Sequence, residues 1–117
     1  MEVLKPNGVL VSITPNSYLC NKSSLKLRKY LFDNRYIEEI IDFKDEKVFP
    51  NISVYCCITV FTKKDKKNII YNNKSIAYKD IVKNYSLFDI SNTNKTSLKD
   101  ICKITNGIAT LRDKIYI

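Results

Sequence analysis

Residues 53–62 constrain the fold of this chain more than any other stretch. They read Ser-Val-Tyr-Cys-Cys-Ile-Thr-Val-Phe-Thr, with apolar or β-branched side chains at both even and odd positions. Neighbouring side chains of a strand point to opposite faces of its sheet, so a run of this kind has both faces covered. The sequence therefore predicts an interior strand.

Two further strands and one helix are predicted upstream. Residues 9–14 are short, apolar and β-branched, typical of a strand buried on both faces of a parallel sheet, and Pro15 closes the run. Residues 36–43 alternate imperfectly and predict a second strand. A short loop joins this strand to residues 53–62, which makes the two antiparallel and the sheet mixed. Between the first two strands we expect a helix from Ser23 or Ser24 to Asn34. Ser23 is its predicted cap, and one face of the helix is predicted from the i, i+3, i+4, i+7 spacing of Leu27, Tyr30, Leu31 and Asn34.

The chain changes character after residue 63. Residues 68–71 predict a short strand, residues 76–85 a short amphipathic helix, and residues 90–96 a linker rich in Ser, Asn and Thr. A new apolar pattern begins at Leu98. We therefore divide the chain into residues 1–63, a linking segment 64–96 and a further segment 97–117.

Composition excludes several classes of protein. The apolar share of 44% is ordinary for a globular domain. No apolar run approaches the roughly 18 residues of a membrane-spanning helix. The first residues carry no signal-like region, so we expect a cytoplasmic protein without membrane contact. The four cysteines form no Cys-x-x-Cys pair and there is no histidine. We therefore expect reduced cysteines and no metal site.

The net charge of +8 has two interpretations. Lysine and arginine attract phosphates and displace their counterions, which favours nucleic-acid binding. Alternatively, the excess of Lys, Asn, Ile and Tyr reflects AT-rich coding, and the lysines of residues 63–67 form a solvated linker. Charge alone does not choose between them.

The residues alone reveal no active site. Without histidine, a general base at neutral pH would have to be a perturbed carboxylate, lysine or tyrosine. The carboxylates of residues 38–46 are not forced into one cleft by any pattern. The only glycines are Gly8 and Gly107, which excludes a glycine-rich phosphate cradle.

Three segments in order carry a resemblance. Residues 4–19 read Leu-Lys-Pro-Asn-Gly-Val-Leu-Val-Ser-Ile-Thr-Pro-Asn-Ser-Tyr-Leu, and residues 48–55 read Val-Phe-Pro-Asn-Ile-Ser-Val-Tyr. They resemble the strand that follows the catalytic strand, and the loop before the reversed strand, in gamma-class adenine-N6 DNA methyltransferases of restriction-modification systems. Between them, the expected helix and the strand at residues 37–43 match the next two elements of the family. Residues 97–117 are similar to the start of the target-recognition domain of these enzymes, with Lys99 where a glycine is usual.

The resemblance implies an α/β fold, namely a partial Rossmann-like methyltransferase sheet of strand, helix, strand and reversed strand, with a C-terminal extension. It implies transfer of a methyl group from S-adenosylmethionine to the exocyclic amine of adenine in double-stranded DNA. The donor-binding turn and the catalytic Asn-Pro-Pro-Tyr motif of the family are absent from this sequence. We therefore expect no catalytic or cofactor-binding residue here, no activity from the chain alone, and an upstream methyltransferase fragment or subunit as partner.

The resemblance also assigns a role to Phe49. Enzymes that modify a base inside a duplex must first extrude it, and the extruded base loses its stacking partners. The family aromatic at the position of Phe49 packs on this base, and Pro50 would stiffen the loop. From the residues alone, a core aromatic before a strand is the favoured interpretation of Phe49.

Four other residues are weaker candidates. Asn16, in Thr14-Pro15-Asn16, lies either at the ligand-facing edge of the sheet or in a structural turn where it bonds its own backbone. Lys22, Lys26 and Arg28 could contact DNA phosphates, although a solvated helix face is the favoured interpretation of these residues.

Two alternatives to the enzyme fragment stay open. In the first, the chain is a non-catalytic DNA- or partner-binding subunit or remnant of a restriction-modification system. In the second, it is a small α/β domain whose similarity to the family is accidental. If the catalytic strand lies elsewhere, the strand at residues 9–14 should form an open edge of the sheet.

Overall fold

The computed structural model describes residues 1–87 and 101–103. The elements run in the order β1 (Val9–Pro15), the 3₁₀ helices η1 (Asn16–Leu19) and η2 (Lys22–Ser24), α1 (Leu25–Asp33), β2 (Ile37–Asp42), β3 (Cys56–Thr62), β4 (Asn68–Tyr71), β5 (Lys74–Ala77) and α2 (Tyr78–Ile81). The predicted linker 90–96 lies outside the described residues, as does nearly all of segment 97–117. The division of the chain into three segments stays a prediction.

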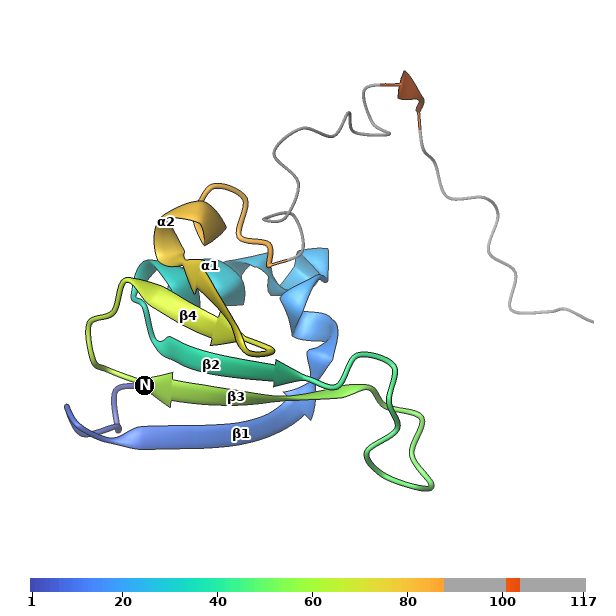
Figure 1. Cartoon of the computed structure of the whole chain (residues 1–117), viewed down its shortest axis with the longest axis horizontal. Helices are drawn as coiled ribbons and strands as arrows, with labels where there is room; N and C mark the ends of the chain where they lie inside the picture. Colours follow the sequence, from blue (N-terminus) through green and yellow to red (C-terminus); the bar gives the residue numbers. More distant parts are fainter. Residues whose placement is uncertain (88–100, 104–117) are drawn as a thin grey trace, which may run out of the picture.

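The five strands form one mixed sheet in the order β1-β3-β2-β4-β5 (Figure 1). The reversed strand β3 is antiparallel to both β1 and β2, whereas β2 and β4 are parallel. This confirms the α/β class, the strand-helix-strand-reversed strand order and the interior position of β3. The strand order also confirms that β1 is an edge strand. The prediction that β1 is buried on both faces is wrong, because Val9, Val11 and Ile13 are each more than half exposed.

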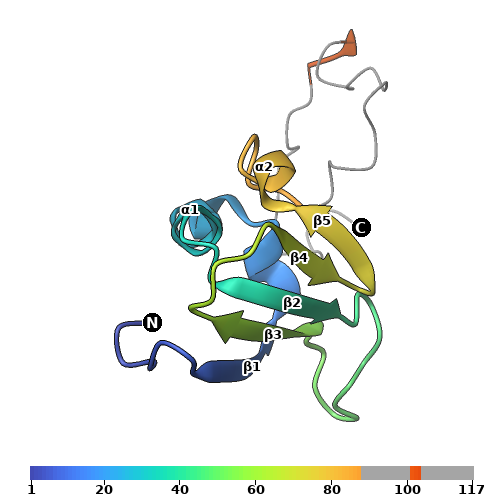
Figure 2. The ribbon, with the colours of Figure 1, turned by 60° about the vertical axis from the view of Figure 1, so that its left-hand side comes forward.

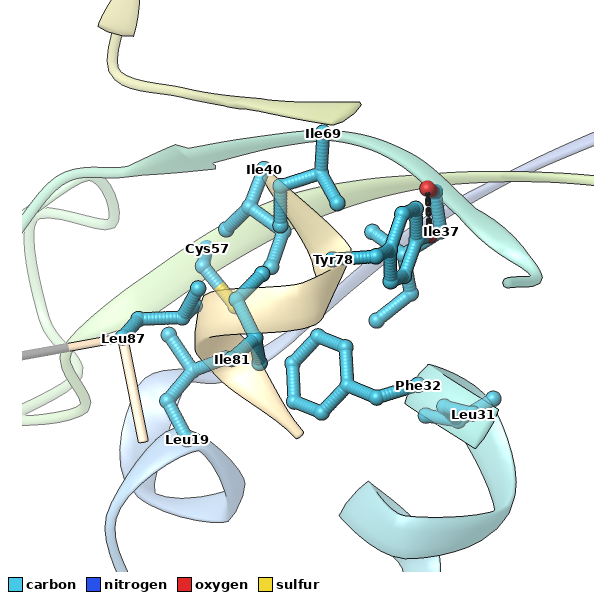
Figure 3. Packing of buried hydrophobic residues seen from close by; sticks show 10 residues of the cluster. All are labelled: Leu19, Leu31, Phe32, Ile37, Ile40, Cys57, Ile69, Tyr78, Ile81 and Leu87. Carbon is cyan, nitrogen blue, oxygen red and sulfur yellow. Dashed lines mark hydrogen bonds between the residues drawn. The ribbon is translucent and has the colours of Figure 1, made fainter. Parts of the chain in front are cut away.

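The core lies between one face of the sheet and the helices. Figure 2 shows α1 and α2 on the same side of the sheet, and Figure 3 shows side chains of both helices meeting those of the central strands. Phe32 of α1, Ile40 of β2 and Ile81 of α2 are each at most 1% exposed. Tyr78 packs edge-on against Phe32, with 6.4 Å between ring centroids, and its hydroxyl donates a hydrogen bond to the main-chain oxygen of Ile37.

Helix α1 forms where predicted but turns a different face to the core. Its buried residues are Arg28, Leu31 and Phe32, which follow the helical i, i+3, i+4 spacing. Leu27 and Tyr30, expected on the buried face, are about half exposed. The helix begins at Leu25 and is preceded by Ser24, and no side-chain cap bond forms there, so the cap predicted at Ser23 is wrong.

The predicted helix over residues 76–85 is half wrong. Residues 74–77 form β5, which pairs with β4, and only Tyr78–Ile81 is helical. Asn72 and Asn73 lie between the two strands with φ of 44° and 65°. Consecutive positive φ values are the mark of a tight two-residue hairpin turn, and asparagine tolerates them better than most residues. The pair Asn72-Asn73 was the available signal for this hairpin.

Candidate functional site

Three strands end at the same edge of the sheet. Because β1 and β2 are both antiparallel to β3 and β4 is parallel to β2, the carboxyl ends of β1, β2 and β4 meet where β3 begins. Pro15 of β1 lies opposite Cys56, and Asp42 of β2 lies opposite Cys57. Open α/β sheets bind their ligands beyond the carboxyl ends of their strands. We call this side the carboxyl edge.

A long loop leaves the sheet at the carboxyl edge. It consists of residues 43–55, connects β2 to β3 and projects away from the sheet (Figure 1); we call it the edge loop. Two turns shape it: the Glu46 main-chain N–H donates to the Phe43 oxygen at 3.0 Å, and that of Ile52 donates to the Phe49 oxygen at 3.3 Å.

Phe49 lies near the middle of the edge loop and is 39% exposed. It is therefore outside the hydrophobic core, and Pro50 beside it is exposed as well. The neighbouring apolar side chains of the loop are also exposed, namely Val48, Ile52, Val54 and Tyr55. Several apolar side chains exposed on one loop are typical of a surface that contacts another molecule. The structure thus makes the Phe49 ring available, and leaves its stacking role as a proposal.

Asp42 is the most highly connected side chain at the carboxyl edge. It is 8% exposed, and its Oδ1 accepts hydrogen bonds from Asn16 Nδ2 and from the Lys44 main-chain N–H, both at 2.9 Å. Its Oδ2 accepts a bond from the Tyr71 hydroxyl at 2.8 Å. Burial, and then the Asp42 carboxylate, raise the pKa of Tyr71. The phenol therefore stays protonated and donates to Asp42.

Asn16 does not bond its own backbone, which was one of the two interpretations of its sequence. Its Nδ2 donates to Asp42 and, at 3.2 Å, to the main-chain oxygen of Lys44. Its main-chain N–H donates to the Tyr55 oxygen at 2.9 Å. Asn16 therefore links the end of β1 to both ends of the edge loop.

The three residues considered for DNA contact fall into two groups. Lys22 in η2 and Lys26 in α1 are exposed. Arg28 is only 7% exposed; its guanidinium donates to the main-chain oxygens of Tyr18 at 2.8 Å, Asn21 at 2.7 Å and Tyr85 at 3.0 Å. Arg28 is thus committed to the fold and does not face a phosphate. The sequence did not predict the burial of Arg28, because the pattern of residues in a helix does not distinguish a buried arginine from an exposed one.

The described residues offer little reactive chemistry. No group of three or more metal-ligating side chains occurs among them. Burial raises the pKa of the Cys57 thiol, which keeps it protonated and a poor nucleophile. None of the four cysteines, all of which lie among the described residues, is in a disulfide, and none of the described helices is long and apolar enough to cross a membrane.

The described residues do not fit a methyl-donor site. Gly8 precedes β1 and lies at the opposite end of that strand from the carboxyl edge, and a Cβ on it would approach Leu4 within 2.8 Å. It therefore serves a turn and not a ligand cradle. Asp42, the buried carboxylate of the edge, is already bonded to side chains and backbone of this chain.

An open groove lies beside β1. It has a volume of about 430 Å³ and runs between the helix-facing side of β1 and α1, with Leu10, Leu27, Tyr30 and Phe61 in its lining. Nearly all of its surface is apolar. A groove of this composition next to an edge strand is suited to packing and not to catalysis.

The described residues thus form an open mixed α/β sheet whose edge loop, at the carboxyl ends of the strands, carries an exposed aromatic residue. Comparison with known proteins narrows the class. Residues 1–49 match the model of the Eco57I restriction-modification methylase family. The chain is 30% identical to the Type II restriction enzyme and methyltransferase RM.Eco57I of Escherichia coli, over the whole chain and 14% of that protein.

Two further relatives match over 56% of the chain. The Type II methyltransferase M.BanIII of Aneurinibacillus aneurinilyticus is 41% identical, and M.HincII of Haemophilus influenzae is 36% identical, covering 11% and 13% of those proteins. The chain is therefore related to the methyltransferases of restriction-modification systems. It spans about one seventh or less of the length of the relatives it matches.

Proposed function

We propose that this chain supplies the target-base stacking part of a site-specific DNA methyltransferase that modifies the exocyclic amine of adenine. The observation that carries the proposal is the exposed Phe49 ring on the edge loop, beyond the carboxyl ends of the strands. The relationship to restriction-modification methyltransferases supports the general activity. Adenine as the target rests on the resemblance of residues 4–19 and 48–55.

The role of Phe49 follows from the cost of extruding a base. A base swung out of a duplex loses stacking, and an aromatic side chain restores about 1–3 kcal/mol per base. Phe49 offers a ring face in a loop whose two ends are fixed to the sheet, so less freedom is lost on contact. Pro50, which has a fixed φ, restricts the backbone beside the ring.

S-adenosylmethionine is the proposed methyl donor of the complete enzyme, to which it would supply an activated methyl group. The described residues do not fit a donor site, because Gly8 serves a turn and Asp42 is already bonded within this chain. We propose that an upstream methyltransferase segment or subunit contributes the donor site and the base for the amine proton. The proposed setting is the cytoplasm, where double-stranded DNA is the substrate.

The test is reconstitution. The chain is coexpressed with a polypeptide that carries Asn-Pro-Pro-Tyr, and transfer of a labelled methyl group to DNA is measured. Phe49→Ala should lower the rate about tenfold to a hundredfold, the equivalent of one stacking contact, and Phe49→Trp should retain most of it. Ile52→Ala, a similarly exposed apolar residue of the same loop, is the control. Equal rates for Phe49→Ala and Ile52→Ala would refute the stacking role.

A second candidate function is a non-catalytic DNA-binding subunit. The observation that favours it is the net charge of +8 together with the exposure of Lys22 and Lys26. In that case the chain alone binds duplex DNA with an affinity that falls steeply with salt. Replacing Lys22 and Lys26 by alanine should then flatten the salt dependence, and no partner should restore methyl transfer.

A further inference from the structure

The edge loop is held at both ends by one residue, Asn16, which follows β1. Asn16 donates from Nδ2 to the Lys44 oxygen at 3.2 Å, at the start of the loop, and from its main-chain N–H to the Tyr55 oxygen at 2.9 Å, at the end. Both ends of the edge loop are thereby attached to the carboxyl end of the neighbouring strand.

Asp42 fixes the direction in which the loop leaves β2. Lys44, two residues later, has φ of 54°, a left-handed conformation that residues other than glycine and asparagine disfavour. Its N–H donates to Asp42 Oδ1 at 2.9 Å, and the same oxygen accepts from Asn16. The hydrogen bond from the Lys44 N–H to Asp42 stabilises the left-handed backbone conformation of Lys44, as aspartate side chains commonly do in turns.

The Asp42 carboxylate is itself held from the other side of β2. Tyr71, at the end of β4, donates its hydroxyl to Oδ2 at 2.8 Å. The side chain of Asn72 accepts a hydrogen bond from the main-chain N–H of Asp42 at 2.7 Å and donates one to the main-chain oxygen of Asp42 at 3.0 Å. A carboxylate bonded on both oxygens and along its own backbone has little freedom to turn.

We propose that Asn16 and Asp42 are positioning residues, which together hold both ends of the edge loop so that Phe49 is presented above the carboxyl edge. The inference rests on the proposed function and names the residues that prepare its stacking surface. Neither side chain needs to touch the base. They raise the fraction of molecules in which the Phe49 ring is already positioned to stack on the base. The apparent affinity for the base is proportional to that fraction.

The absence of tryptophan from the chain allows a direct test. Phe49→Trp places a single tryptophan at the position in question, and the anisotropy of its emission, excited at wavelengths that tyrosine does not absorb, and its quenching by acrylamide report the order of the loop in the full chain. In this background Asp42→Ala and Asn16→Ala should each raise quenching and lower anisotropy. Asp42→Asn keeps an oxygen for the Asn16 and Lys44 donors, so it should stay close to the parent.

A structural control separates positioning from general instability. Tyr78→Phe removes a buried hydrogen bond to Ile37, at the opposite end of β2 from Asp42, and should destabilise the fold without changing the fluorescence of the introduced tryptophan. If Asp42→Ala leaves quenching at the parent value, or changes it only as much as Tyr78→Phe does, the proposal is wrong.

The second arm uses DNA. A duplex with adenine opposite an abasic site lowers the cost of extrusion, and stacking of the base should quench the introduced tryptophan in the reconstituted enzyme. Asp42→Ala should weaken this binding about tenfold, and Asp42→Asn much less. If the tryptophan fluorescence does not respond to the duplex while loop order still depends on Asp42, the stacking function fails but the positioning role stands. Loop order that is independent of Asp42 and Asn16 overturns the positioning role itself.

Discussion

Arg28 of α1 donates a hydrogen bond from Nε to the main-chain oxygen of Tyr85, 3.0 Å away and 57 residues later in the chain. The same guanidinium reaches Tyr18 and Asn21 through Nη1, so one side chain joins η1, the segment before η2 and the segment after α2. An arginine suits this task because its planar guanidinium carries several donors in fixed directions.

Replacing Arg28 by alanine should therefore destabilise the fold. The change removes three charge-assisted hydrogen bonds from a side chain that is 7% exposed, and we expect a loss of about 3 kcal/mol in the free energy of unfolding. Arg28→Lys should be intermediate, because an ammonium group cannot reproduce the geometry. Urea denaturation measures both. Lys26→Ala, on the exposed side of α1, is the control and should change stability by less than about 0.5 kcal/mol.

Alkaline pH should destabilise the protein through its buried tyrosines. Desolvation raises the pKa of Tyr78, which is 2% exposed, and of Tyr18. Above the ordinary tyrosine pKa of about 10 the unfolded chain loses protons that the folded chain keeps, so the contribution of these tyrosines to stability is constant below that pH and falls above it. Each such group contributes a slope of about 1.4 kcal/mol per pH unit. Urea denaturation at a series of pH values measures the slope.

Tyr78→Phe distinguishes this explanation from general alkaline damage. The variant should be less stable at neutral pH, since the Ile37 oxygen loses its partner, yet its stability should fall less steeply above pH of about 10. A slope equal to that of the parent would show that Tyr78 does not keep its proton in the folded state.

The sequence predicted the central part of the fold because its signals are local. An apolar run on both parities marks β3 as interior, and the short loop before it requires an antiparallel β2. The edge position of β1 followed from the family resemblance, since residues 9–14 on their own indicate a buried strand. The β4–β5 hairpin was missed because asparagine at Asn72 and Asn73 signals a turn less strongly than glycine does.

The candidate site was predictable in position but not in its contacts. The motif around Phe49 indicated the edge loop, and Thr14-Pro15-Asn16 indicated the end of β1. The bond between Asn16 and Asp42 joins residues 26 positions apart, and depends on β1 and β2 flanking the same strand. Nothing local in the sequence reports that arrangement. The burial of Arg28 has the same origin, because its partners lie in three separate segments.

Amide hydrogen exchange should show that β1 is the least protected of the three long strands. It pairs with β3 on one side only, whereas β3 is paired on both. Edge amides that face solvent exchange without global unfolding. We expect weaker protection across residues 9–15 than across residues 57–61 in the monomer. Equal protection of the two strands would contradict an open edge.

The open edge should also govern self-association. Unpaired strands attract further strands, and a lysine on an edge strand discourages such pairing. Val11 lies at this edge, is 59% exposed and pairs with Val60, so Val11→Lys should reduce concentration-dependent association while changing the free energy of unfolding by less than about 0.5 kcal/mol. Ser23→Lys adds the same charge at an exposed position away from the edge and should leave association unchanged. Sedimentation velocity over a range of concentrations measures the effect, and equal association of the two variants would show that β1 is not the contact surface.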